Sequence, residues 1–404
     1  MSRRISNVVR LSLAVVMLLA VSAGCAARPE VAATSPDACH WPYGCDVKPQ
    51  KTPEILDLAA RARLPADTFT IGPPSGSELG DQLNGRRLPF EDQPVQGFSA
   101  VIDAGGTGDA YWLLPDNGYG VKNNSSDFLL RMYQVRIDFE SGRGSSGDIS
   151  VEGFIKLRDP DGLIPFPITN ENTEDRLLTG ADFDPESVRR DEAGDLWFGD
   201  EYGPYLLHTD ATGRVLEAPY PLPGVAAPEN PYLGSPKLAT LPSSKGFEGM
   251  AISGDGRFLY VALGGALEGD PDQRRRFIYE FNLQYERYTG RYWQYRADSS
   301  KDTITELTSP AEDPNHRLLV VERSGGTPEN DQSADVYLVA LGQTDSSGFL
   351  VKRKVLGLPY PHIESLIPLD DRRMLIFNDN DYPFTTNDTQ GLIVRLGKPL
   401  PKEP

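Results

Sequence analysis

One pattern recurs along this chain at intervals of about 60 residues, and it restricts the possible folds more than any other feature. A glutamate opens an apolar run, a polar turn follows, and a second apolar run ends in acidic residues or glycines. The stretch 97–120 has the same frame with Ser99 in the glutamate position. The four glutamates, spaced by 62, 58 and 58 residues, are Glu186, Glu248, Glu306 and Glu364. Such a period indicates one structural unit used several times.

The repeated unit has the pattern of four short antiparallel strands. Two further strand-like runs follow the second glutamate, Glu248, at 276–283 and 291–297, and two follow the third, Glu306, at 335–341 and 349–358. The 39 glycines and 34 prolines are scattered between apolar runs, as turns require. Four strands in about 60 residues are typical of a propeller blade. We therefore predict an all-β fold, a β-propeller of five or six four-stranded blades.

The blade boundaries follow from the repeat. We predict blades at 97–158, 182–223, 246–297, 303–358 and 362–397. The last range contains only three clear strands, so the ring is expected to close between N- and C-terminal strands, with residues 69–73 as the fourth strand. Residues 52–64 have apolar side chains at helical spacing and are predicted as a short helix. Whether residues 61–96 or 140–180 form a sixth blade stays open.

The overall charge limits the classes of ligand that the protein is expected to bind. The chain has 58 acidic and 40 basic residues, for a formal net charge of −18. Such a protein repels phosphate backbones, which argues against nucleic acid as a partner. Carboxylate oxygens in excess suit hard cations, of which Ca²⁺ is the first candidate.

The recurring acids are predicted to converge, because the innermost strand of every propeller blade lines a central channel. Carboxylates facing one another are unfavourable unless a cation, water or raised pKa values compensate. The predicted Ca²⁺ ligands are Glu186, Glu248, Glu306 and Glu364, with Asp116, Glu322 and Asp379 at the strand ends. Asp200, Glu201 and Glu248 are the predicted catalytic carboxylates, for proton transfer. The alternative is that these acids bind backbone amides of the neighbouring blade.

Several stretches together resemble a known family. They are QPVQGFSAV, LLPDNGYG, LRDPDG, LLTGADFDPESV, LWFGDEYGPYLLHTD, GFEGMAIS and LYVAL. Over about residues 61–397 the chain resembles the bacterial exported proteins called the esterase-like activity of phytase family, a β-propeller domain. The resemblance implies hydrolysis of phosphate or carboxylic esters, assisted by Ca²⁺.

A phosphate ester would also need cations and a group that contacts the reacting atoms. Arg323 follows Glu322 directly, and its guanidinium could clamp a phosphate. Lys122 and Ser99 are further substrate-binding candidates. No GxSxG elbow is present. A nucleophilic Ser99 would need a base such as His208 or His362, both close to acidic blade positions.

The N-terminus indicates export. Residues 1–24 combine a basic start with an apolar stretch of eleven, which predicts a signal peptide rather than a membrane span. Ala-Gly-Cys at its end resembles a lipobox, so Cys25 is the predicted lipidation site and this anchor the only membrane contact. Residues 25–60 have the composition of a tether, with a predicted local disulfide between Cys39 and Cys45. The propeller domain is expected at 61–404.

Three functions remain open from the sequence. The first is an exported hydrolase of phosphate or other esters that uses Ca²⁺ held by channel carboxylates, lipid-anchored in the cell envelope or secreted. The second is a non-catalytic cell-surface propeller that binds a surface ligand. The third is a Ca²⁺-dependent lactonase-like propeller. An open pocket that combines acids with a cation would favour catalysis, and a plugged channel would favour binding.

Overall fold

The computed structural model describes residues 58–105, 108–140, 145–310, 313, 316–325, 333–402 and 404. The signal peptide at 1–24, Cys25 and the Cys39–Cys45 pair lie outside the described residues, so these stay predictions. Among the residues described, no helix is long and apolar enough to cross a bilayer. The only helices there are three-residue 3-10 turns, namely η1 (Ser77–Leu79), η2 (Lys122–Asn124) and η3 (Pro236–Leu238). The prediction of an all-β fold is confirmed.

Three sheets are antiparallel meanders of four consecutive strands. The first contains β10 (Pro185–Arg190), β11 (Leu196–Asp200), β12 (Tyr205–Thr209) and β13 (Tyr220–Pro221). The second contains β14 (Phe247–Ile252), β15 (Phe258–Leu263), β16 (Arg275–Asn282) and β17 (Arg287–Arg296). The third contains β18 (Thr303–Thr308), β19 (Arg317–Arg323), β20 (Ala334–Thr344) and β21 (Leu350–Leu358).

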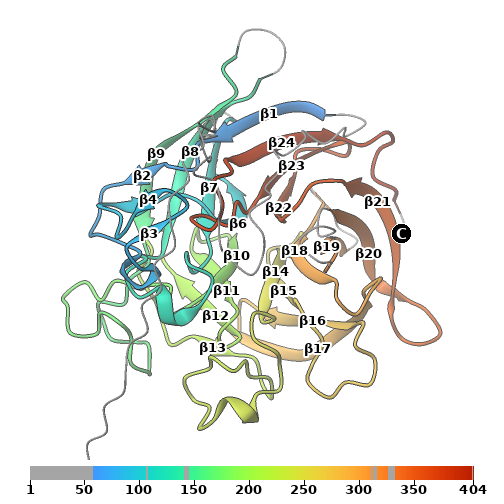
Figure 1. Cartoon of the computed structure of the whole chain (residues 1–404). Coiled ribbons are helices and arrows are strands. Elements are labelled where there is room, and N and C mark those ends of the chain that lie inside the picture. The colour runs from blue at the N-terminus through green and yellow to red at the C-terminus, as the bar shows by residue number, and fades with distance from the viewer. Residues whose placement is uncertain are drawn as a thin grey trace, which may run out of the picture. The chain divides into compact units, whose positions relative to one another are not determined.

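A larger sheet of eight strands joins two further meanders. One is formed by β6 (Phe98–Asp103), β7 (Ala110–Pro115), β8 (Arg131–Asp138) and β9 (Asp148–Lys156). The other is formed by β22 (Ile363–Pro368), β23 (Arg373–Asn378), β24 (Thr389–Arg395) and β1 (Leu58–Leu64). A single parallel pair, Arg63 with Asp148, connects β1 to β9. Figure 1 shows these two groups next to each other along one edge of the domain.

The first strands of the meanders form a closed cycle. β6 contacts β10, β10 contacts β14, β14 contacts β18, β18 contacts β22, and β22 contacts β6. Figure 1 shows these strands around the middle of the view, with the later strands of each sheet farther out. One position on each first strand therefore comes close to its counterparts on the others.

Apolar side chains fill the space between neighbouring sheets. One core cluster joins Leu319 and Val336 of the third meander to Leu366, Ile376 and Val394 of the eight-stranded sheet. Strands covered on both faces need apolar residues at consecutive positions rather than in alternation. This explains runs such as FLYVAL, in which every residue after the first is buried.

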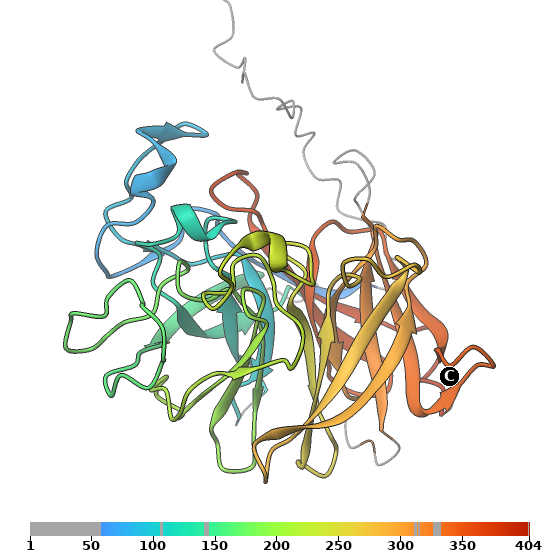
Figure 2. The same ribbon diagram turned by 90° about the horizontal axis from the view of Figure 1, so that it is seen from below.

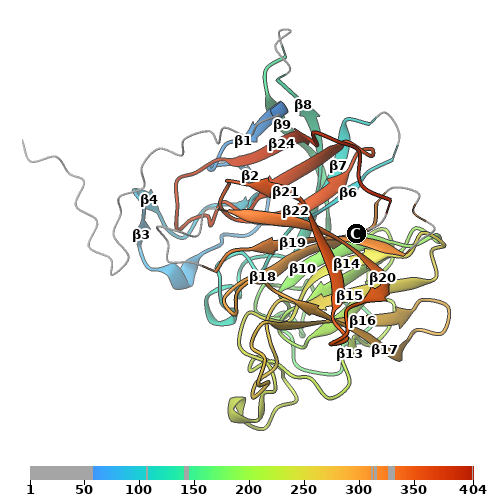
Figure 3. The ribbon, with the colours of Figure 1, turned by 90° about the vertical axis from the view of Figure 1, so that its right-hand side faces the viewer.

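The structure corrects the predicted closing strand. β1 pairs antiparallel with β24, which completes the last meander with an N-terminal strand, as Figure 3 also shows. The prediction of residues 69–73 for this role was wrong, because β2 (Phe69–Thr70) pairs instead with β5 (Gln93–Pro94). The described end of the predicted helix at 52–64 is a strand. Its burial alternates, with Ala62 and Leu64 buried and Arg63 exposed, which is the period of a strand.

The ranges left open for a sixth blade form no further four-stranded sheet. Residues 69–94 contain only the short pairs β2–β5 and β3–β4, the latter formed by β3 (Gln82–Leu83) and β4 (Arg86–Arg87). Residues 157–184 are all described and contain no strand. Figure 2 shows η2 and η3 on the upper side of the sheets in that view, together with the segment that carries β2 to β4.

Candidate functional site

Every first strand carries a β-bulge near its start, at the second residue in four strands and at the third residue in β18. The pairing with the next strand shifts at this point in all five cases, and the skipped residues are Ser99, Glu186, Glu248, Thr305 and Glu364. A bulge adds one residue to a strand and re-aims its side chain, and bulges are common beside functional sites. Four of the five positions are those singled out by the sequence repeat. The period in the sequence therefore reflects a repeated backbone irregularity.

The second strand of each meander contributes one more position. One residue of the second strand pairs with the first-strand residue just before the bulge. The next residue along the second strand is, in chain order, Asp116, Glu201, Gly264, Arg323 or Asp379. Two positions per meander thus reach the same end of the ring. The side chains at these ten positions include six carboxylates and one guanidinium.

Eight of these ten positions, all but Thr305 and Gly264, line a cavity of about 230 Å³. Its carboxylates are Asp116, Asp184, Glu186, Glu201, Glu248, Glu364, Asp379 and Asp381. Lys245, Arg323 and His362 are its basic residues, and Ser99 and Asn117 also line it. A larger hollow of about 380 Å³ lies beside β1 and β4, but it is lined by only two acids, and its Arg86 is paired with Asp67. Eight carboxylates against two permanent cations mark the smaller cavity as the candidate site.

Burial and mutual repulsion raise the pKa of several carboxyl groups in this cavity. Burial raises the pKa of Glu364 to about 8, with Glu248 and Asp379 adding to the effect and Arg323 opposing it. Burial and Asp381 raise the pKa of Asp379 to about 7. Burial raises the pKa of Asp184 to about 6 against hydrogen bonds from Asn117. The same causes hold the pKa of Glu186 well above its usual range.

Two overlapping groups of these acids have the proximity of metal ligands. Asp184, Glu186 and Glu201 each offer an oxygen, and these atoms lie within 4.8 Å of one another. Glu186, Glu248 and Glu364 form a second such group. Glu186 belongs to both. Oxygen ligands from several carboxylates are the set that Ca²⁺ prefers.

Glu306 is not part of this cavity. Thr305 occupies the bulge in β18 and donates its hydroxyl to the Ile363 carbonyl at 2.9 Å. Glu306 is one residue farther on, and a shift of one residue sends a side chain to the other face of a strand. Its Oε1 accepts hydrogen bonds from Arg189 Nη2 at 2.8 Å and from the Leu307 amide at 2.7 Å. Glu306 thus binds an arginine side chain across the ring on β10 and a backbone amide of its own strand.

Asp200, Glu322 and Lys122 also lie outside the set of described residues that line the cavity. Asp200 accepts the amide protons of Asp184 at 2.8 Å and Gly203 at 2.7 Å, so it holds the backbone beside the site. Glu322 accepts hydrogen bonds from Tyr295 at 2.6 Å and from Lys352 at 2.9 Å. Lys122 reaches the Glu229 carbonyl at 3.4 Å and lies over the Tyr202 ring.

The comparisons with known proteins agree with this arrangement at the level of the family. Residues 93–382, well over half of the chain, match the family described as esterase-like activity of phytase, or phytase-like. The chain belongs to this phytase-like family. The matched range contains all five bulges and every acid of the cavity.

Individual relatives of this phytase-like chain are distant. An uncharacterized secreted protein of Arthroderma benhamiae is 30% identical over 159 residues, and the match spans 31% of each chain. An exo-β-1,3-galactanase of Phanerochaete chrysosporium has a TM-score of 0.44 and 10% identity, covering 81% of this chain and 66% of its own. A periplasmic gluconolactonase of Pseudomonas aeruginosa has a TM-score of 0.32 and 13% identity, covering 84% and 98%. These low scores carry no inference about activity.

Two residues of the phytase-like site, Asp184 and Lys245, were missed from the sequence. Asp184 precedes Glu186 by two residues, a spacing that puts both side chains on one face of a strand. Asn117 donates its backbone amide to Asp184 at 3.1 Å and its side-chain amide at 2.7 Å. Lys245 lies with its Nζ 3.9 Å from Glu248 Oε1. The signal for Asp184 was present in the sequence, because it stands two residues before the repeated Glu186.

Proposed function

We propose that the chain is an exported, Ca²⁺-dependent hydrolase of phosphate or other esters, built as a β-propeller of five blades. The closed cycle of five first strands supports the blade count. Each blade would contribute one bulge residue to the cavity end of the ring, and the last blade would take its outer strand from the N-terminus.

The observation that carries the proposal is the composition of the cavity. Eight carboxylates share about 230 Å³ with one lysine and one arginine. Without a cation, several of these groups must stay protonated, as their raised pKa values indicate. The donor set fits Ca²⁺, because it consists of hard oxygen ligands from several carboxylates. Glu186, Glu248 and Glu364, which form one of the two ligand groups, would hold the ion.

The residues of the cavity can perform the remaining parts of an ester hydrolysis. When bound, Ca²⁺ would polarise the ester oxygen and lower the pKa of a bound water. Arg323 donates from Nη1 to Glu364 Oε1, which orients its guanidinium at the cavity, where it can bind the oxygens of a phosphate group. Burial and Glu248 hold the pKa of Glu201 well above its usual range. A proton on a Glu201 carboxyl oxygen is therefore available to the leaving alkoxide.

One observation favours catalysis over a purely binding propeller. The cavity joins paired acids of raised pKa with a guanidinium and an ammonium group, the combination expected where protons and anionic substrates are handled. The lactonase reading uses the same acids on an uncharged ester. It needs no anion-binding group, so Arg323 and Lys245 favour a phosphate ester.

A substrate panel distinguishes these functions. The mature protein with saturating Ca²⁺ is given phosphomonoesters, phosphodiesters, carboxylic esters and lactones at matched concentrations. We expect turnover of a phosphate ester to exceed that of its uncharged analogue. Preference for lactones would replace the phosphatase reading, and a flat panel together with tight Ca²⁺ binding would support the binding propeller.

Arg323→Gln tests the proposed phosphate contact. We expect KM for a phosphate ester to rise about 10- to 100-fold, because a charge-assisted bidentate contact is lost, while hydrolysis of an uncharged ester changes little. Arg323→Lys should recover only part of the loss, since the planar fork is missing. Arg317→Gln is the matched control at the other end of β19, where Arg317 is paired with Asp313. Equal KM for wild type and Arg323→Gln would contradict this role.

Gly264→Ala tests the packing around Glu248. A Cβ at position 264 would lie 2.5 Å from both Cγ and Oε1 of Glu248, so the carboxylate must move. We expect Ca²⁺ affinity to fall at least tenfold, measured by calorimetry. Gly342→Ala in β20 is the control, since an added Cβ there meets no atom within 4 Å. Unchanged Ca²⁺ affinity in Gly264→Ala would exclude Glu248 as a ligand in its present position.

Export and lipid anchoring complete the proposal. The basic and apolar N-terminus supports export, and the matched Arthroderma benhamiae protein is described as secreted. Cys25→Ala should move the protein from the membrane fraction to the soluble fraction of the cell envelope. An unchanged distribution would exclude Cys25 as the anchor.

A further inference from the structure

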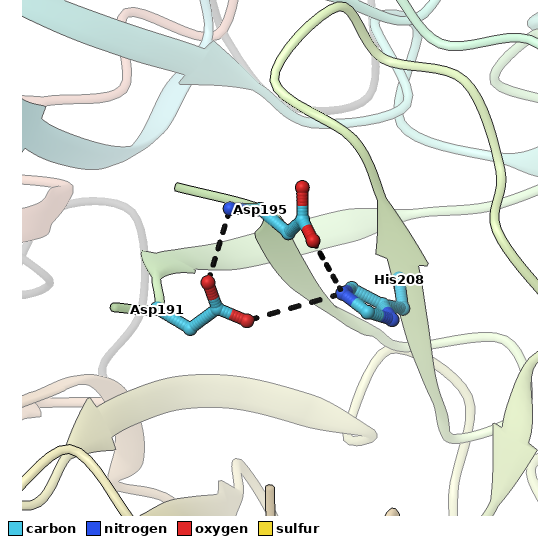
Figure 4. Close-up of side chains that lie close together, drawn as sticks. All are labelled: Asp191, Asp195 and His208. Carbon is cyan, nitrogen blue, oxygen red and sulfur yellow. Dashed lines mark hydrogen bonds and ion pairs between the residues drawn. The ribbon is translucent and has the colours of Figure 1, made fainter. Parts of the chain in front are cut away.

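The first meander carries a second cluster of metal-ligating side chains, away from the cavity. Figure 4 shows Asp191, Asp195 and His208, whose side chains point toward one another. Asp191 and Asp195 lie in the turn between β10 and β11, and His208 lies on β12. The bulge at Glu186 is at the opposite end of the β10–β11 hairpin, so about five residues of strand, roughly 17 Å, separate the two clusters.

His208 is buried with one nitrogen unpaired. The residue is 7% exposed, and its Nε2 has no hydrogen-bond partner among the described residues. Nε2 lies 3.9 Å from Asp195 Oδ2 and 4.0 Å from Asp191 Oδ2, too far for hydrogen bonds. A buried polar nitrogen without a partner is costly and requires an explanation. An ion between the three atoms would satisfy it.

The other nitrogen of His208 is held as in protein metal sites. Nδ1 lies 2.5 Å from Glu217 Oε1. A metal-binding imidazole usually donates its second N–H to a carboxylate, which fixes the tautomer and the ring orientation. With the proton on Nδ1, the lone pair of Nε2 faces the two aspartates. Trp197 stacks on the ring, with centroids 3.8 Å apart, and further fixes its plane.

The aspartates are also fixed by their surroundings. Asp191 Oδ1 accepts the backbone amides of Ala193 at 2.9 Å and Asp195 at 3.0 Å, while its Oδ2 accepts the Trp197 indole proton at 3.0 Å. The carboxylate of Asp191 is thus oriented before any ion binds. The hydrogen bond from the Asp195 amide to this carboxylate holds the two aspartates next to each other.

We propose that Asp191, Asp195 and His208 form a second cation site, for a divalent transition metal such as Zn²⁺. One imidazole and two carboxylates are ligands that Zn²⁺ accepts, whereas Ca²⁺ takes oxygen ligands alone. A tetrahedral Zn²⁺ at about 2.1 Å from each ligand places the ligand atoms about 3.4 Å apart, so the distances from His208 Nε2 to the two aspartate oxygens need to contract by about half an ångström. The bound ion would join the β10–β11 turn to β12. This proposal is independent of the proposed hydrolase function.

Co²⁺ titration of the metal-free mature protein tests the site. Excess Ca²⁺ is present so that it occupies any site that offers only oxygen ligands. The visible absorption of bound Co²⁺ then reports a site with a nitrogen ligand. We expect one Co²⁺ per chain, displaced by Zn²⁺. His208→Gln should weaken binding at least 100-fold, and Glu217→Gln, which removes only the orienting carboxylate, should weaken it 10- to 100-fold. His316→Gln is the control, as His316 pairs with Tyr260 elsewhere.

Stability measurements keep the test valid if His208→Gln folds poorly. Asp195→Asn changes a partly exposed turn residue and should fold, yet lose most of the Co²⁺ affinity. Zn²⁺ should raise the melting temperature of wild type and of His316→Gln, but not of Asp195→Asn. Absence of Co²⁺ and Zn²⁺ binding by wild type, or equal binding by wild type and both cluster variants, would overturn the proposal. The cluster would then be an ion-pair network around His208.

Discussion

Glu186→Gln is expected to weaken Ca²⁺ binding by about 100-fold while stabilising the Ca²⁺-free protein. Glu186 is the one acid shared by both ligand groups of the cavity, so its loss removes charge from each of them. In the Ca²⁺-free protein the same change removes a buried group whose pKa is raised by burial, Asp184, Glu201 and Glu248. Relief of this repulsion should raise the melting temperature. The opposite signs of the two effects separate loss of a ligand from general damage.

Glu306→Gln is the matched control for this prediction. Glu306 belongs to the same sequence repeat and is more buried than Glu186, but it pairs with Arg189 rather than lining the cavity. We expect its Ca²⁺ affinity to stay within about twofold of wild type. Its melting temperature should fall, because Arg189 is left buried with a weaker partner. Calorimetry and thermal unfolding measure both quantities. A Glu306→Gln variant that loses Ca²⁺ binding as Glu186→Gln does would contradict the placement of the site.

The second large effect is a loss of stability of the Ca²⁺-free protein as pH rises. Burial raises the pKa of Asp184 from 3.8 to about 6, of Asp379 from 3.8 to about 7, and of Glu364 from 4.5 to about 8. Between pH 4 and pH 8 the folded protein therefore binds more protons than the unfolded chain. The free energy of unfolding falls with pH in this range. As far as these groups decide, stability is highest at about pH 4 and below, and a few kcal/mol are lost by pH 8.

Ca²⁺ should reverse this trend, because it binds the ionised carboxylates. The difference in melting temperature between Ca²⁺-bound and chelated protein is expected to widen from pH 5 to pH 8. Thermal unfolding at fixed free Ca²⁺ across this range provides the measurement. A chelated protein that becomes more stable from pH 5 to pH 8 would show that the cavity acids are not held together as described.

The fold was largely predictable because its repeat has a backbone cause. The bulges at Glu186, Glu248 and Glu364 fall at the same place in successive meanders, so an acid marks each unit. The closing strand was harder to predict. Ala60, Ala62 and Leu64 are spaced at two residues, but the alanines are small and the stretch also fits a helix. Only pairing with β24, more than 300 residues away, decides between the two.

The candidate site was only partly predictable for a related reason. In the fourth unit Thr305 and Glu306 are adjacent, and the acid has the stronger signal. The hydrogen-bond register places the threonine in the bulge, and a register is a property of two strands rather than of one sequence stretch. The cluster of Asp191, Asp195 and His208 was missed because the two aspartates also have the pattern of an ordinary turn.

The rate of hydrolysis of a phosphate ester during a Ca²⁺ titration of chelated mature protein tests the central claim most directly. We predict no turnover before Ca²⁺ is added and a rise that follows the binding curve measured by calorimetry. Glu186→Gln should need about 100-fold more Ca²⁺ for the same rate. Turnover that is unaffected by chelation, or its absence at saturating Ca²⁺ for every ester class, would contradict a Ca²⁺-dependent hydrolase at this cavity.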